Sequence, residues 1–232
     1  PPPPPPPPPP FFFFTHKPEK AILSGLVGSE MCIRDSLYSE LFPLVGEVRT
    51  WDWSDGDATF MEGVEDETYE FVHSSHCLEH LEDPEAGLNN WFRILKPGGY
   101  LVVTVPDEDL YEQGIFPSTF NADHKWTFTI SKQQSWCDKS INVFDLLPKL
   151  GEAVEVMKVE LLNQGYRYVL PRFDQTLTPI GEAGIEFVVR KRTPEEIAFC
   201  GLHKHPGEVD GLLFKLLTGI PKPELKRDDK EE

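Results

Sequence analysis

The sequence predicts an α/β fold in which helices cover a mostly parallel sheet. Three consecutive features between residues 69 and 106 carry the prediction: a β-rich segment, a helix with clear start and stop signals, and a second apolar, β-rich segment. A strand, a helix and a strand in this order form a βαβ unit, in which the two strands are parallel. We therefore take this stretch as the centre of the fold.

The first predicted strand covers residues 69–73 and ends in the polar residues Ser74, Ser75 and His76. Open α/β sheets bind their ligands just outside the carboxyl ends of their strands. Ser75 and His76 are therefore candidate ligand-binding residues.

The helix that follows is bounded by recognisable signals. Asp83 is a good N-cap and Pro84 suits the first helical position, while residues 96–99, KPGG, are expected to close the C-terminus. Apolar residues recur at helical spacing, at Leu88, Trp91, Phe92 and Leu95. Residues 101–105 then form a continuous apolar run, which is typical of a central strand covered on both faces.

Shorter patterns flank this unit. Residues 48–53 have strand composition, and residues 153–162 and 184–192 predict two later strands. Residues 140–150 predict an amphipathic helix that Pro148 kinks or ends early. The sheet is therefore expected to extend on both sides of the central unit.

Residues 106–130 form a long polar and aromatic insertion after the apolar run. Loops of more than about 12 to 15 residues without regular structure are usually functional. The ring side chains of this insertion are Tyr111, Phe116, Phe120, His124 and Trp126. Ligand pockets are lined mainly by apolar and aromatic groups, so we expect the insertion to form one wall of a pocket.

The two ends of the chain differ in composition from its middle. Residues 1–36 begin with runs of proline and phenylalanine, and residues 26–36, LVGSEMCIRDS, resemble a translated sequencing adaptor. We therefore exclude residues 1–36 from the fold, with a native disordered arm as the alternative. Residues 37–192 are expected to form one domain, and residues 193–232 a peripheral or disordered tail.

Composition argues against several classes of function. With 39 acidic and 22 basic residues the net charge is −17, which disfavours a nucleic-acid partner because phosphate binding needs clustered Lys and Arg. No apolar run approaches the roughly 20 residues that a membrane helix needs. Four widely spaced cysteines without a CxxC pair fit a reducing compartment. We expect a cytoplasmic protein without membrane contact, and the oligomeric state is not predicted.

Residues 69–106, YEFVHSSHCLEHLEDPEAGLNNWFRILKPGGYLVVTVP, resemble the class I S-adenosylmethionine-dependent methyltransferases of the type 11 branch. The matching pieces are the YEFV start, the SSHCLEH loop, the Asp-Pro helix start and the RILKPGG turn, although Glu70 stands where the family usually has Asp. The resemblance implies a Rossmann-like, seven-stranded sheet that is mostly parallel, with an antiparallel last strand. It also implies S-adenosylmethionine as the cofactor and no required metal.

The resemblance implies residues for the cofactor as well. The family's glycine-rich loop follows its first strand and would lie before Leu37, where no such pattern occurs, so we expect this strand and loop to be missing. Asp57 and Ala58 match the family's element that places an Asp on the adenine amine. Asp52 is the candidate for the acid that binds the ribose hydroxyls. It stands only five positions before Asp57, so a turn residue is the alternative.

Two histidines are candidate general bases. His80 follows the polar loop after the first predicted strand, and His124 lies in the insertion. An imidazole, with a pKa of about 6.5, can take a proton from an acceptor hydroxyl or amine. The alternatives are that His80 braces the helix start and that His124 is a solvated loop residue. The H-x-x-H-C-x-x-H pattern of residues 73–80 suggests zinc, but a strand alternates faces and no second ligand pair follows at a finger-like spacing, so we expect no metal.

The expected function is methyl transfer from S-adenosylmethionine to an O or N nucleophile of a small molecule or glycan precursor, by an enzyme of the EC 2.1.1 class. Two alternatives stay open: a non-catalytic methyltransferase-like fragment, and a nucleotide- or NAD-binding Rossmann enzyme. The second requires a G-x-G-x-x-G turn, and the SSHCLEH and RILKPGG segments argue against it.

Overall fold

The structure is a computed structural model, which describes residues 22–25, 48–51, 55–177 and 181–199. It divides into two compact units, Pro1–Thr193 and Pro194–Glu232. In the second unit the described residues form the short helix α4 (Pro194–Ala198).

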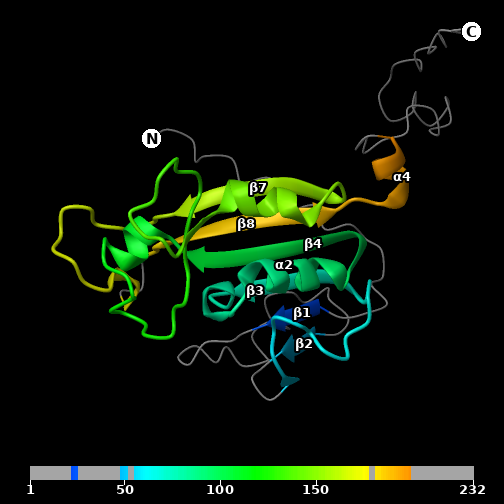
Figure 1. Cartoon of the computed structure of the whole chain (residues 1–232), viewed down its shortest axis with the longest axis horizontal. Helices are drawn as coiled ribbons and strands as arrows, with labels where there is room; N and C mark the ends of the chain where they lie inside the picture. The colour runs from blue at the N-terminus through cyan, green and yellow to red at the C-terminus, as the bar shows by residue number, and fades with distance from the viewer. Residues whose placement is uncertain (1–21, 26–47, 52–54, 178–180, 200–232) are drawn as a thin grey trace, which may run out of the picture. The chain divides into compact units, whose positions relative to one another are not determined.

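The first unit is organised around a six-stranded sheet with the order β2-β1-β3-β4-β8-β7 (Figure 1). Its strands are β1 (Ile22–Gly25), β2 (Val48–Trp51), β3 (Tyr69–Ser75), β4 (Leu95–Pro106), β7 (Val154–Leu162) and β8 (Gly184–Lys191). The first four are mutually parallel, and β8 runs antiparallel to both β4 and β7. The predicted α/β sheet with an antiparallel last strand is confirmed, although the described residues form six strands in it and not seven.

The strand β1 corrects one expectation. The sequence predicts that the first strand is missing, but Ile22–Gly25 lies between β2 and β3, where Ile22 pairs with Val48 on one side and with Phe71 on the other. The reason is that a four-residue segment can supply the backbone hydrogen bonds of both neighbours without a recognisable apolar pattern. Residues 26–47, which follow β1, lie outside the described residues, so the absence of the glycine loop stays a prediction.

The central unit is built as its sequence predicts. Between β3 and β4 lie the one-turn helix η2 (Leu78–His80) and the helix α2 (Pro84–Arg93). The Asp83 carboxylate caps α2 by accepting a hydrogen bond from the Ala86 amide at 2.9 Å. Leu88, Trp91 and Phe92 are buried on its inner face. The helix therefore begins at the predicted residue and packs by the predicted side.

The turn into β4 differs from the prediction. Leu95 belongs to β4 and pairs with Tyr69, so α2 ends before the KPGG segment. A register shift follows between Tyr69 and Phe71, which the KPGG segment accommodates. A Cβ on Gly99 would lie 2.9 Å from the Glu70 carbonyl oxygen, so only glycine fits this close approach.

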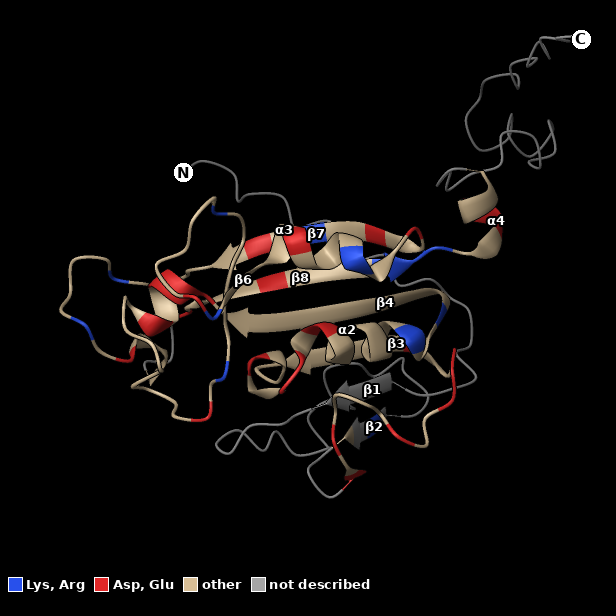
Figure 2. Cartoon of the chain, in the orientation of Figure 1, with Lys and Arg blue, Asp and Glu red and all other residues tan. Residues whose placement is uncertain are grey.

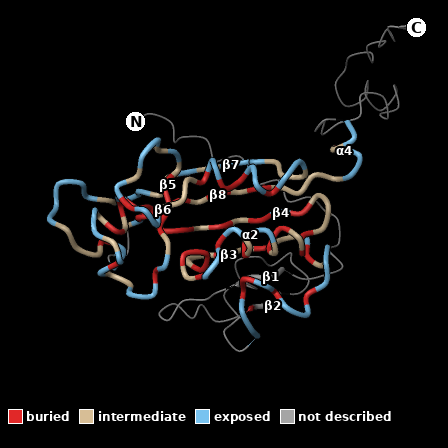
Figure 3. The backbone as a smooth tube through the Cα atoms, viewed as in Figure 1, coloured by how far each residue is buried: buried red, intermediate tan, exposed pale blue. Residues whose placement is uncertain are grey.

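Buried residues follow the central strand β4, whereas the edge strand β7 is largely half-buried or exposed (Figure 3). Residues at alternate positions of β4 and β8 are buried, while their neighbours are only half-buried or exposed. The buried set consists of Leu101, Val103, Val105, Ile185, Phe187 and Val189. The prediction that residues 101–105 are covered on both faces is therefore wrong for the described residues, and the strand follows a period of two.

Residues 140–150 divide into three short elements where the sequence predicts one helix. These are β6 (Ser140–Asn142), α3 (Val143–Leu146) and η4 (Leu147–Leu150), and Pro148 lies in the last of them. The amphipathic pattern of residues 140–150 nevertheless identifies the buried side of this segment, since Leu146, Leu147 and Leu150 are buried.

The insertion lies at the carboxyl ends of β3 and β4, near the arrowheads in Figure 1. It contains the single-turn π-helix η3 (Glu108–Glu112) and the strand β5 (Thr127–Thr129), which pairs with β6. A further one-turn helix, η5 (Gln175–Leu177), precedes β8. Figure 2 shows acidic residues gathered on η3. No helix in the described part of the chain is both long and apolar enough to span a membrane.

Candidate functional site

The strand order places the expected ligand crevice between β1 and β3. From β1 the chain moves outward to β2, and from β3 it moves the other way to β4, so the order reverses at this pair. Ligands of open α/β sheets bind at such a switch point, outside the carboxyl ends of the strands. The ligand crevice is therefore expected beside Ser74 and Ser75, the residues that end β3.

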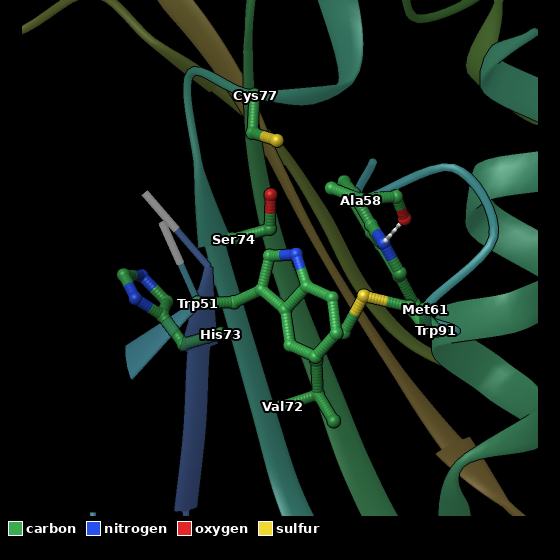
Figure 4. Close-up of a pocket in the computed structure, with 8 residues that line it drawn as sticks. All are labelled: Trp51, Ala58, Met61, Val72, His73, Ser74, Cys77 and Trp91. Carbon is green, nitrogen blue, oxygen red and sulfur yellow. Dashed lines mark hydrogen bonds between the residues drawn. The ribbon is translucent and has the colours of Figure 1, made fainter. Parts of the chain in front are cut away.

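A small apolar pocket lies at this point (Figure 4). Its walls include Trp51, Ala58, Met61, Ser74 and Trp91, and its free volume is about 10 Å³. That volume is about what one water molecule needs. The pocket is therefore too small to enclose a nucleoside. Its lining residues form a packed apolar surface on which a nucleoside could lie, and we call this surface the floor.

The predicted adenine element is held firmly at this floor. The Trp91 indole donates to the Ala58 carbonyl oxygen at 2.9 Å, which fixes the turn to α2 (Figure 4). The exposed Asp57 carboxylate accepts from the Thr59 amide at 2.8 Å, as in an Asx turn. Ala58 therefore lines the pocket and the exposed Asp57 precedes it in the chain, whereas Asp52 lies outside the described residues.

The end of β3 adds two polar features. The Ser74 hydroxyl is buried and has no hydrogen-bond partner among the described residues, whereas Ser75 is half-buried. His76 has a φ of 51°, and its amide donates to the Thr104 carbonyl oxygen at 2.9 Å, so the chain turns away from the sheet here. The unpartnered Ser74 hydroxyl, the Asp57 carboxylate and the apolar floor fit a nucleoside. Sequence reasoning missed Ser74, because the burial of its hydroxyl depends on residues that meet only in the fold.

A second centre surrounds the Glu79 carboxylate in η2, whose side chain is fully buried. Three imidazole nitrogens lie near its Oε1 atom: His76 Nδ1 at 3.3 Å, His80 Nε2 at 3.9 Å and His124 Nε2 at 3.9 Å. We call Glu79, His76, His80 and His124 the Glu79 cluster. It joins residues of the β3–α2 loop to a residue of the insertion.

Neighbouring acceptors fix the orientation of two of these rings. His124 Nδ1 lies 2.8 Å from Glu112 Oε1, and His80 Nδ1 lies 3.1 Å from the Asp123 carbonyl oxygen. A carboxylate and a carbonyl only accept hydrogen bonds, so both Nδ1 atoms donate. In the neutral imidazoles the unprotonated nitrogen is therefore Nε2, which faces Glu79.

The cluster perturbs the ionisation of its members. Burial alone raises the pKa of Glu79, but contact with His76 and the positive charge that His76, His80 and His124 carry when protonated outweigh it and hold this pKa below its ordinary value. Burial likewise lowers the pKa of His76, and the Glu79 carboxylate outweighs it, so the pKa of His76 is raised. Glu79 thus stays ionised although it is buried.

The structure brings together the two predicted bases. The sequence presents His80 and His124 as separate candidates, yet their rings meet edge to face with centroids 5.1 Å apart. The amides of Lys125 and Trp126 also donate to the Glu79 carbonyl oxygen at 2.9 and 3.1 Å, which ties the insertion to η2. Glu79 stands in the SSHCLEH loop and could have been singled out there. Glu112 carries no signal in the sequence.

A groove of about 440 Å³ opens beside η3 and is lined in part by Asp109, Gln113, Trp136, Tyr166, Tyr168 and Arg172. The rings predicted to line a pocket serve other contacts. Tyr111 packs on His124 with centroids 5.0 Å apart, and the Trp126 indole donates to the Leu81 carbonyl oxygen at 3.1 Å. Sequence reasoning missed the groove, because its aromatic residues come from segments after the insertion.

Known proteins resemble this chain in sequence over its central part. A family model described as a methyltransferase domain matches residues 31–145. This match assigns residues 31–145 to a methyltransferase domain family. An uncharacterized methyltransferase of Schizosaccharomyces pombe is 36% identical over 58 residues, which are 25% of this chain and 20% of that protein. The chain thus spans about a fifth of the length of this curated relative.

Solved structures of methyltransferases are distantly similar to this chain. A SAM-dependent methyltransferase from Archaeoglobus fulgidus is 16% identical with a TM-score of 0.48, covering 75% of this chain and 87% of that one. A SAM-dependent methyltransferase from Thermotoga maritima, a possible histamine N-methyltransferase, is 20% identical with a TM-score of 0.46, covering 75% and 84%. The cofactor of this methyltransferase family is S-adenosylmethionine.

Proposed function

We propose that this methyltransferase transfers the methyl group of S-adenosylmethionine to an O or N nucleophile of a small molecule or glycan precursor. The observation that carries the proposal is the orientation of His80 and His124, whose Nε2 atoms converge beside the strand edge where the family binds its cofactor. The cofactor supplies a methyl group on a sulfonium centre, which a lone pair attacks in line. The chain must bind, orient and deprotonate the acceptor.

The floor at the end of β3 suits the nucleoside part of the cofactor. Asp57 offers an exposed carboxylate for an amine, and Ser74 offers a hydroxyl that has no other partner among the described residues. Ser75 and His76 extend this polar edge, and Asp52 remains our candidate for the ribose hydroxyls. Ala58 and Trp51 supply apolar surface for the base.

The Glu79 cluster suits the proton of the acceptor. A neutral imidazole whose Nδ1–H is already engaged presents Nε2 as a proton acceptor. The Glu79 carboxylate would then stabilise the imidazolium that forms, because opposite charges attract strongly where water is excluded. His80 and His124 are therefore proposed as the catalytic bases, with either one able to accept the proton.

The groove beside η3 suits a small polar acceptor. Its volume of about 440 Å³ lies in the range of small-molecule sites, roughly 300–1,000 Å³. Two of its rings are held by their polar ends, since the Trp136 indole donates to Asp109 at 3.0 Å and the Tyr166 hydroxyl donates to the Leu110 carbonyl oxygen at 3.0 Å. Flat fixed rings beside acidic and amide groups fit a sugar or another polar metabolite.

The buried free thiols of Cys77 and Cys137 fit the reducing cytoplasm that we propose as the location.

Calorimetry with S-adenosylmethionine tests the proposal. We expect Asp57→Ala to weaken binding by about 1.5–3 kcal/mol, because a hydrogen bond to a polar ligand group is lost. Glu62→Ala changes another exposed carboxylate of the same loop and should bind like the wild type. Transfer of a labelled methyl group to candidate acceptors then separates an enzyme from a non-catalytic relative. Binding of NAD in place of S-adenosylmethionine would overturn the proposal.

A further inference from the structure

We propose that Glu79, His80 and His124 bind one divalent metal ion of the zinc class. One ligand atom from each of these residues lies within 4.8 Å of the other two. In the part of the chain that the structure describes, this is the one group of three or more such residues that converge in this way. Ligand atoms of a tetrahedral zinc site lie about 3.4 Å apart, so a small inward movement completes the geometry.

The hydrogen bonds around the group leave a place for a cation. Both Nδ1 atoms donate outward, to Glu112 and to the Asp123 carbonyl oxygen, so two Nε2 lone pairs and a carboxylate face one another. Neither oxygen of Glu79 accepts a hydrogen bond of good geometry from a described residue. A buried carboxylate in that position is costly unless a positive charge compensates it. A metal ion at this point satisfies all three groups at once.

The second layer of contacts resembles that of a built metal centre. Histidine ligands of metals usually donate their other ring nitrogen to a carboxylate or a carbonyl, which fixes the ring and increases its basicity. His124 does this with the fully buried Glu112, and His80 does it with the insertion backbone. Both histidines are held inside the protein, because only 12% of the His80 side chain and 2% of the His124 side chain are exposed.

The site is reachable from solvent on one side. The His80 side chain is 12% exposed and that of His76 is 39% exposed, whereas Glu79 is fully buried. His76 Nδ1 lies 3.3 Å from Glu79 Oε1, so this ring either supplies a fourth ligand or borders an open position. Two nitrogens and one carboxylate suit zinc and its first-row neighbours better than magnesium or calcium, which prefer oxygen.

The inference deepens the proposed function, on which its chemical role rests. A cation beside an acceptor hydroxyl or amine lowers the pKa of that group, so its proton passes to water and its lone pair remains to attack the methyl group. His80 and His124 would then act as ligands, and not as free bases. Binding of the ion, in contrast, needs neither cofactor nor acceptor.

Calorimetry with zinc on the chelator-treated full chain tests the site. We expect one ion per chain and an absorption spectrum of tetrahedral type when cobalt replaces zinc. Glu79→Gln and His124→Gln should weaken zinc binding at least about 100-fold, and Glu112→Gln about 10- to 100-fold because only the outer contact is altered. His73→Gln is the matched control, since it changes a β3 histidine outside the group and should alter affinity less than about twofold.

Two results would overturn the inference. One is a folded Glu79→Gln variant that binds zinc as the wild type does, with folding checked by circular dichroism. The other is an equal loss in His73→Gln, which would place the ion elsewhere. If His124→Gln fails to fold, Glu112→Gln decides in its place. Zinc binding without methyl transfer would refute the proposed function alone, and methyl transfer without zinc binding would refute the metal site alone.

Discussion

The βαβ unit supplies two strands of the sheet and the insertion follows them in the chain, but the two regions bury different kinds of side chain. In the unit, Trp91 and Leu101 are 3% and 0% exposed. In the insertion, the buried side chains include Glu108, Glu112 and His124, which are 0%, 0% and 5% exposed. Apolar burial is favourable by itself, whereas a buried charge needs a partner at hydrogen-bond distance. The apolar side chains of the unit therefore stabilise the fold, whereas the buried polar side chains of the insertion, together with Glu79 from the β3–α2 loop, form the candidate site.

The largest effect is expected in the unit. Trp91→Ala should lower the free energy of unfolding by about 3–5 kcal/mol, because it removes a buried ring and leaves a cavity. It also removes the hydrogen bond from the indole to the Ala58 carbonyl oxygen. Urea unfolding measures the loss. Asn89→Ala on the exposed face of α2 should stay within about 0.5 kcal/mol of the wild type, and equal losses would deny the difference between the two faces.

A pH experiment on the insertion should give a somewhat smaller effect. Burial raises the pKa of Asp107 from 3.8 to about 6; the Leu110 and Asp109 amides and the Lys132 ammonium oppose this rise, and the Asp109 carboxylate adds to it. The protonated form is thus favoured in the folded state. Its stabilising contribution is complete below about pH 4 and is lost as the pH rises through about 6, by about 3 kcal/mol in all.

Asp107→Asn isolates this effect, because its amide oxygen can still accept from the Asp109 and Leu110 backbone. We expect the wild type to lose stability relative to the variant between pH 4 and pH 7 in urea titrations. Taking the difference cancels groups that titrate in the opposite sense, such as Glu79. A difference that stays constant over this range would mean that Asp107 is ionised throughout.

The third expected effect concerns a single buried partner. Glu112→Ala leaves the His124 Nδ1–H without its acceptor at 2.8 Å, and should cost about 1–3 kcal/mol in the free energy of unfolding. Glu112→Gln keeps an acceptor oxygen and should cost less than half as much. Thermal unfolding of both variants measures the ordering. If the two variants lose the same stability, the contact between Glu112 and His124 stabilises the fold by packing and not by a hydrogen bond.

The smallest effect is expected for a surface ion pair. Lys149 Nζ lies 2.6 Å from Glu85 Oε2, and both side chains are about half exposed. Lys149→Gln should lower the free energy of unfolding by less than about 1 kcal/mol, and added salt should reduce the difference further. Urea unfolding at low and high salt checks this. A larger loss would mean that η4 depends on the pair to stay on α2.

The elements that local patterns determine could be read from the sequence. Asp83 and the apolar spacing of α2 define that helix, because capping and helical period act within a few residues. The same spacing continues to Leu95 and predicts that it belongs to the helix. It belongs to β4 instead, because its pairing with Tyr69 depends on another strand. The strand β1 lies within residues 1–36, which their composition excludes from the predicted fold, so no local pattern there predicts it.

The site could be read only in part. His80 and His124 were named as bases from their chemistry and their place in the chain, but nothing local indicates that the two rings meet. Glu112 reaches His124 because η3 makes a single π turn, which has no sequence signature. Ser74 and the groove follow from burial and from segments that meet only in the fold. The roles of all these residues stay predictions.

The backbone bond between the insertion and η2 sets how freely the site can open. The amides of Lys125 and Trp126 both donate to the Glu79 carbonyl oxygen. The part of the insertion that carries His124 therefore cannot move away from η2 without breaking both hydrogen bonds. The His80 ring also donates to the Asp123 carbonyl oxygen and the Trp126 indole to the Leu81 carbonyl oxygen. At about 0.5–1.5 kcal/mol for each of the four bonds, an open form would be populated at about three per cent or less. Entry and exit of a bulky acceptor would then wait on this rare opening, and turnover would follow its rate.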